Sequence, residues 1–129
     1  MQPSSLKPHN ELMRFPAILV AIVALIPFAF AQSAGNKQLV KFQAAYSSAK
    51  KALAAKPKDK KVRTAFVVAA DRYATSMMVE STLAPRLRYP GALRLYREVL
   101  KVDPKNPEAL NNSKMIIDVY KSMGRPVPK

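Results

Sequence analysis

The stretch ALRLYREVLKVDPKNPEAL, residues 92–110, contains the end of one helix and the start of another. In its first half, apolar residues recur at steps of three and four, which places them on one side of a helix: Leu93, Tyr96, Val99 and Leu100. Pro104 ends this helix, because the residue before a proline is pushed out of the helical region. Asn106 is a favourable N-cap, and Pro107 suits the first position of the next helix. The stretch therefore predicts two helices joined by a short turn.

Two further helices are predicted before this stretch. A helix over residues 36–55 would place one apolar stripe inward: Leu39, Phe42, Tyr46, Ala49 and Leu53. A helix over residues 60–83 would bury Val62, Phe66, Ala69, Ala70, Tyr73 and Met77. Residues 84–91, APRLRYPG, contain two prolines and a glycine and no helical stripe, so they predict a loop. The third helix is therefore expected to begin near Pro90.

The fourth helix, which begins at Pro107, is expected to end at Gly124, since glycine commonly follows a helix C-terminus. Its predicted buried residues are Leu110, Ile116, Ile117, Tyr120 and Met123. No segment predicts a strand, because the one β-like apolar run, residues 65–70, lies inside a longer helical period. The sequence thus predicts an all-α fold of four helices, with residues 125–129 as an extended tail.

The first and third helices share a pattern. Residues at common offsets are Ala45, Ala49, Ala52, Leu53 and Pro57 in the first, and Ala92, Tyr96, Val99, Leu100 and Pro104 in the third. Ala92, Tyr96, Leu100 and Pro104, followed by the DPKNPEAL junction, resemble the second helix of a tetratricopeptide repeat. The two prolines are 47 residues apart, whereas that family repeats about every 34 residues. The resemblance implies about two helix pairs in which Ala92 allows close helix crossing; the alternative is a simple four-helix bundle.

The tetratricopeptide resemblance also implies a function. Proteins of this type bind a protein or peptide in a groove lined by the first helix of each pair. Here that groove would lie between the second and fourth helices, with Arg72, Asn112 and Lys114 as contact candidates. Two pairs leave the last apolar face uncovered, so a partner, self-association or an end cap is expected to cover it.

The N-terminal residues have the order of a bacterial export signal. Residues 15–30, FPAILVAIVALIPFAF, carry no charge, and Lys7 and Arg14 precede them. Small residues before Gln32 predict cleavage after Ala31, which gives a signal at residues 1–31 and a helical domain at residues 32–124. The alternative is a membrane anchor at residues 15–31. The expected location is periplasmic or extracellular, and translation starts at Met1 or at Met13.

Basic residues dominate the part of the chain after the predicted signal. Of the 22 lysines and arginines, 20 follow residue 31, against 7 of the 8 acidic residues. The candidates for an anion-binding surface are Arg86, Arg88, Tyr89, Arg94, Arg97 and Lys101. Such a surface predicts an alternative function, electrostatic binding to an anionic envelope polymer or lipid surface. Nucleic acid would be the partner only if the chain were not exported.

The sequence contains few residues that could perform catalysis. It has no cysteine, three glycines, and one histidine, His9, which lies in the predicted signal. The mature chain therefore lacks a thiol nucleophile, an imidazole proton shuttle and a glycine-rich phosphate loop. No catalytic residue, cofactor or metal is expected, and the sequence predicts a non-catalytic interaction module.

Overall fold

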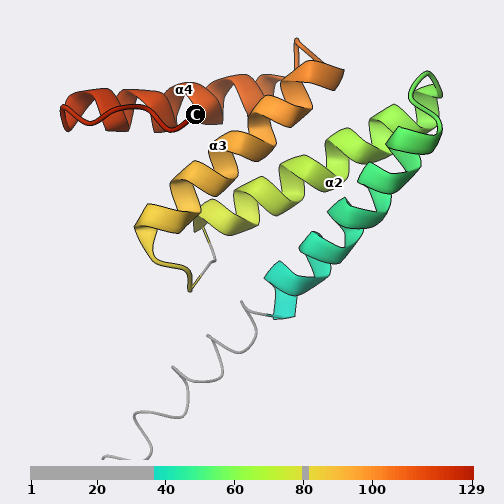
Figure 1. Ribbon diagram of the computed structural model, residues 1–129, viewed down its shortest axis with the longest axis horizontal. Coiled ribbons are helices and arrows are strands. Elements are labelled where there is room, and N and C mark those ends of the chain that lie inside the picture. The colour runs from blue at the N-terminus through green and yellow to red at the C-terminus, as the bar shows by residue number, and fades with distance from the viewer. Residues whose placement is uncertain (1–36, 80–81) are drawn as a thin grey trace, which may run out of the picture. The chain divides into compact units, whose positions relative to one another are not determined.

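The computed structural model describes residues 37–79 and 82–129, all within one compact unit, Gln32–Lys129. In these residues the chain forms four helices and no strand, which confirms the all-α prediction (Figure 1). Residues 37–55 form the first helix described. The others are α2 (Lys60–Val79), α3 (Pro85–Val102) and α4 (Pro107–Ser122).

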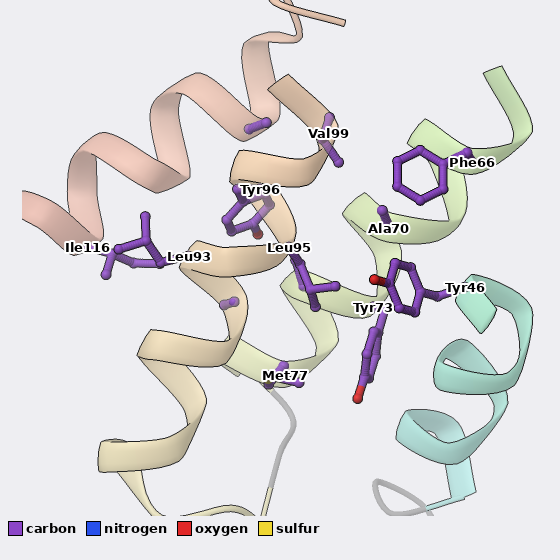
Figure 2. Close-up of a cluster of buried hydrophobic side chains, with 13 residues drawn as sticks. Tyr46, Phe66, Ala70, Tyr73, Met77, Leu93, Leu95, Tyr96, Val99 and Ile116 are labelled. Carbon is purple, nitrogen blue, oxygen red and sulfur yellow. The ribbon is translucent and has the colours of Figure 1, made fainter. Parts of the chain in front are cut away.

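Helix α3 lies at the centre of the packing. It contacts α2 on one side and α4 on the other, and five of its side chains are fully buried: Ala92, Leu93, Leu95, Tyr96 and Val99. The helix over residues 37–55 packs on α2 through Tyr46, whose ring centroid lies 6.0 Å from that of Phe66 and 5.6 Å from that of Tyr73 (Figure 2). The core is therefore a continuous layer of apolar side chains from residue 46 to residue 116.

The loop predicted at residues 84–91 is wrong, because α3 begins at Pro85. Pro85 occupies the first helical position, where a backbone N–H has no helical partner, and the Arg88 N–H bonds the Ala84 carbonyl at 3.1 Å. Pro90 lies inside the helix but removes a single hydrogen bond near its start. Gly91 compensates by close packing, since a Cβ there would lie 2.5 Å from Met77 Sδ. Tertiary contact thus overrides the local proline signal.

Helix α2 ends earlier than predicted. It is described as far as Val79, and residues 82–84 are not helical, whereas the sequence predicted a helix to residue 83. The two corrections belong together. Because the helix of residues 85–102 starts five residues early, the preceding helix must stop early enough to leave a connection.

Both ends of α4 form as the sequence predicts. The Asn106 side chain accepts a hydrogen bond from the Ala109 N–H at 2.8 Å, which confirms the N-cap. At the other end Gly124 has a φ of 64°, a left-handed conformation that favours glycine. The Gly124 and Arg125 N–H groups bond the carbonyls of Lys121 and Tyr120, and this pair of bonds is the Schellman motif.

The buried side of α4 differs from the prediction. Leu110 and Met123 are 46% and 53% exposed, so their predicted burial is wrong. Helix α4 faces α3 with Ala109, Ser113 and Ile116, and Ile117 and Tyr120 pack at the edge of the core. Leu110 follows Ala109 by one residue, a rotation of about 100°, and therefore points away from α3. The predicted positions of Ile116, Ile117 and Tyr120 are thus confirmed, and those of Leu110 and Met123 are wrong.

Residues 125–129 form a non-helical tail that lies against α3. Arg97 Nη1 donates a hydrogen bond of 2.7 Å to the Pro128 carbonyl, and Val127 packs against the core. The predicted export signal and the predicted cleavage between Ala31 and Gln32 lie outside the described residues. Among the helices that the structure describes, none is both long and apolar enough to cross a membrane.

Candidate binding surfaces

Exposed side chains of α2 and α4 form a first candidate surface, named here the α2/α4 face. On α2 its members follow one another at steps of four, three and four, and so share one side of the helix: Val68, Arg72, Thr75 and Val79. On α4 the same steps connect Glu108, Asn112, Met115 and Val119. The four apolar members are between 42% and 70% exposed. Two partly apolar stripes are therefore presented to solvent.

A directed chain of hydrogen bonds joins these two stripes. Thr75 Oγ1 donates to Glu108 Oε1 at 2.5 Å, which uses the only hydroxyl hydrogen of Thr75. The 2.8 Å contact between Thr75 Oγ1 and Tyr96 Oη must then have the tyrosine as donor. Asn112 Nδ2 donates to the same Tyr96 Oη at 2.9 Å. The bonds therefore run in one direction from α4 through α3 to α2 and back to the first turn of α4.

Two further side chains of α2 hold the turn between α3 and α4. Arg63 Nη2 donates to the Val102 carbonyl at 2.7 Å, at the C-terminal end of α3, where a cation is favourable. Asp71 Oδ2 accepts from Asn106 Nδ2 at 3.0 Å, while its other oxygen is buried without a partner. Burial and the nearby Glu108 carboxylate raise the pKa of Asp71 to about 6, although the Asn106 hydrogen bond opposes this rise.

The three predicted partner-binding residues do not share one role. Arg72 is exposed on the α2/α4 face. Asn112 is on the same face but is half-buried and bonded to Tyr96. Lys114 lines a shallow surface hollow on α4 together with Met115 and Val119, and its ammonium pairs with Asp118. Only Arg72 is therefore a free cation on the α2/α4 face among the described residues.

The predicted anion-binding residues are divided between two sides of α3. Arg86, Arg94, Arg97 and Lys101 follow helical steps along one side, whereas Arg88 projects from the opposite side and lies over the Tyr89 ring at 5.7 Å. Arg94 pairs with Glu98 at 3.4 Å, and Arg97 holds the C-terminal tail. The structure therefore leaves Arg86 and Lys101 as the exposed cations of this set that have no ion pair in the described chain.

The residues that carry the repeat resemblance lie in and beside the core. Ala92 and Tyr96 are fully buried, Leu100 packs at the core edge, and Pro104 is exposed in the turn. Two residues at helix contacts were not predicted from the sequence: Gly91, where a Cβ would lie 2.5 Å from Met77 Sδ, and Leu95, which is fully buried. Because Gly91 directly precedes the small residue Ala92, the pair itself was an available signal for close helix crossing.

A second candidate surface, named here the lysine surface, runs along the helix of residues 37–55 and into the following turn. Its exposed members are Lys37, Lys41, Lys51, Lys56, Lys58, Lys60 and Lys61. Residues 37–61 contain one carboxylate, Asp59, which caps α2 by accepting from the Val62 N–H at 3.0 Å. The described ion pairs involve other cations: Lys50, Arg94 and Lys114. The lysine surface therefore keeps its full positive charge.

Lys50 lies on the same helix but, unlike the lysines of the lysine surface, forms an ion pair. It lies on the core side, where its ammonium contacts Tyr46 Oη at 2.9 Å and Glu98 Oε2 at 3.0 Å. The hydrogen bonds with Tyr46 and Glu98 raise the pKa of Lys50. Burial tends to raise the pKa of Glu98, but the hydrogen bonds from Tyr46 and Lys50 outweigh burial and lower it. Lys50 therefore takes part in the contact between its helix and α3, whereas the lysine surface lies on the opposite side of that helix.

The chain matches no protein-family model, and neither curated proteins nor solved structures give a match. No group of histidine, cysteine or carboxylate side chains in residues 37–79 and 82–129 has the arrangement of a metal site. The candidate surfaces therefore rest on the geometry and charge of this chain alone.

Proposed function

We propose that this protein is an exported, non-catalytic helical adaptor of tetratricopeptide-like type that binds a partner protein on the α2/α4 face. The observation that carries the proposal is the hydrogen bond between Thr75 and Glu108. It joins the exposed stripes of two helices that are separated in sequence by the whole of α3. A partner segment laid across this bond would contact both stripes at once.

The acidic side chains support a role without catalysis. All six described carboxylates accept hydrogen bonds within the fold: Asp59, Asp71, Glu98, Asp103, Glu108 and Asp118. Each caps a helix, closes a turn or joins two side chains. A carboxylate that acts as a general base must reach a substrate proton, and each of these groups has at least one oxygen bonded to a structural partner.

The chemistry of the α2/α4 face defines the partner. Val68, Val79, Met115 and Val119 provide apolar contact, and Arg72 provides a cation. The carboxylate of Glu108 accepts a hydrogen bond from the neutral hydroxyl of Thr75 and keeps its charge, so the face carries one cation, Arg72, and one anion, Glu108. The expected partner is an amphipathic segment with apolar side chains for the valines and Met115 and a carboxylate for Arg72.

Site-specific crosslinking in the native envelope tests the proposal. A photo-crosslinking residue replaces Met115 in one protein and Val40 in a matched protein, because Val40 is also exposed but lies on the helix of residues 37–55. We expect a partner to be captured from position 115 and not from position 40. The crosslinked partner segment should contain apolar residues and at least one Asp or Glu.

Substitutions on the α2/α4 face should reduce the amount of crosslinked partner. Val119→Asp should reduce the captured amount at least about fivefold, because a carboxylate would be buried against apolar groups, whereas Val40→Asp should leave it unchanged. Equal capture from both positions, or capture of a second copy of this chain alone, would contradict the adaptor proposal. The mature N-terminus read in the same experiment tests export.

A further inference from the structure

The geometry points to a second interaction surface: the lysine surface binds the anionic headgroups of a lipid bilayer, with the helix of residues 37–55 lying along the membrane. This inference uses residues that do not belong to the α2/α4 face, and it rests on the proposed function only for the export of the chain. Its starting observation is that seven exposed lysines in residues 37–61 form no ion pair in the described chain, and that the one carboxylate among these residues, Asp59, caps α2.

The arrangement of the lysines suits a flat surface. Lys37, Lys41 and Lys51 lie within one side of their helix, opposite the buried ring of Tyr46. From residue 37 to residue 55 the helix is about 27 Å long, and Lys56 and Lys58 continue the charge at its end. The residues between the lysines on this side are small, Ala44, Ser48 and Ala55, so nothing bulky holds the helix away from a plane.

The chemistry of the side chains favours diffuse anions over a single ligand. Lysine is a flexible point charge without the planar fork with which arginine holds one phosphate, and a row of lysines suits a surface of many headgroups. Among the residues that the structure describes, no exposed aromatic side chain lies beside these lysines for a nucleic-acid base to stack on, since Tyr46 is buried and Phe42 packs against the core.

The position of the surface in the chain favours a membrane over a soluble polymer. In the proposed export, the apolar residues 15–30 bring the chain to a membrane. Lys37 lies seven positions after Phe30, so the lysine surface begins close to this segment along the sequence.

Vesicle binding with charge-matched variants tests the inference. One variant replaces four lysines of this surface by glutamine at positions 37, 41, 51 and 58, and the control replaces four lysines elsewhere, at positions 101, 105, 121 and 129. Both variants have the same net charge, and both retain the full chain. Vesicles of phosphatidylcholine alone are compared with vesicles containing phosphatidylglycerol, so that any contribution of the apolar N-terminal segment is common to all measurements.

We expect the wild-type protein to prefer anionic vesicles, with a preference that decreases as salt is added. The four substitutions on the lysine surface should reduce partition into anionic vesicles at least about tenfold, and the control substitutions no more than about threefold. Thermal unfolding of both variants should match the wild type, because none of the eight lysines forms an ion pair in the described structure. Equal losses in the two variants, or equal binding to both kinds of vesicle, would overturn the inference.

A position-specific readout completes the test. Because the chain has no cysteine, Ser48→Cys and Ser122→Cys each introduce one labelling site, the first on the lysine surface and the second on α4. An environment-sensitive dye should respond to anionic vesicles at position 48 and not at position 122. A response only at position 122, or binding to soluble polyphosphate without binding to vesicles, would also overturn the inference.

Discussion

The turn at residues 56–59 and the turn at residues 103–106 have the same backbone and different surroundings. In the first, the N–H groups of residues 56, 59 and 63 bond the carbonyls of residues 52, 56 and 59. In the second, residues 103, 106 and 110 bond residues 99, 103 and 106, which is the same pattern displaced by 47 residues. The N-caps also correspond, since Asp59 accepts from Val62 and Asn106 from Ala109. The two turns therefore share one hydrogen-bond pattern and one type of N-cap at a spacing of 47 residues.

The surroundings differ because of what lies against each turn. The second turn is held by Arg63 and Asp71 of α2, and the helix before it has Ala92, Tyr96 and Val99 fully buried. At the equivalent positions the first helix has three alanines, of which Ala45 and Ala52 are exposed and Ala49 is only partly buried. The helix before the second turn, α3, thus lies at the centre of the core, whereas the helix before the first turn, residues 37–55, lies at the edge and carries the lysine surface. The difference lies in side-chain volume and not in turn geometry.

The largest expected effect comes from making the third helix resemble the first. Tyr96→Ala should lower the free energy of unfolding by about 4 kcal/mol, since it removes a fully buried ring and the hydroxyl that joins Thr75 to Asn112. Tyr96→Phe retains the ring and should cost about 1 to 2 kcal/mol. Urea unfolding followed by circular dichroism measures both. A small effect of Tyr96→Ala would show that α3 is not the centre of the core.

The two N-caps provide the next comparison. Asn106→Ala should cost about 3 kcal/mol, because it removes a cap and also the hydrogen bond to the buried Asp71 carboxyl. Asp59→Ala removes a cap alone and should cost about 1 kcal/mol. Chemical denaturation of the two variants gives the difference directly. Equal costs would mean that the Asp71 contact adds nothing to the second turn.

The buried carboxyl at the second turn should also make stability depend on pH. The pKa of Asp71 is raised in the fold from 3.8 to about 6, so the folded state binds this proton more tightly than the unfolded state. The resulting stabilisation is complete below about pH 4 and is lost as the pH rises through 6, with a change of about 2 to 3 kcal/mol. Asp71→Asn should remove this dependence. The measurement is the difference in unfolding free energy between wild type and variant at several pH values; a difference that does not vary with pH would contradict the assignment.

The sequence predicted the fold well wherever local chemistry decides the structure. Three features could be predicted because each depends on residues within a few positions of one another. They are the N-cap at Asn106, the helix end at Gly124 and the helical spacing of apolar residues. The start of α3 at Pro85 was not predicted, because two prolines and a glycine favour a loop locally, whereas the packing of α3 in the core, which includes the close approach of Gly91 to Met77, depends on residues distant in sequence.

The candidate surfaces were less predictable, since a side chain's availability depends on distant partners. Arg97 belonged to a predicted anion-binding set, but it bonds Pro128, which is 31 residues away. Asn112 was predicted to contact a partner, yet it bonds Tyr96. The lysines of residues 56–61 were visible as a cluster in the sequence. Their freedom from ion pairs in the described chain is a property of the fold alone.

The smallest expected effect concerns the ion pair that joins the first helix to α3. Lys50 contacts Glu98 at 3.0 Å, but its side chain is 52% exposed, so a double-mutant cycle of Lys50→Gln and Glu98→Gln should give a coupling of about 0.5 kcal/mol that decreases in high salt. Tyr46 contacts Phe66 and Tyr73 through its ring, and these contacts exclude water. The helix of residues 37–55 is therefore attached to the core mainly by aromatic packing. The lysines of the lysine surface do not take part in this attachment. A coupling above about 1.5 kcal/mol that resists salt would instead assign the attachment to charge.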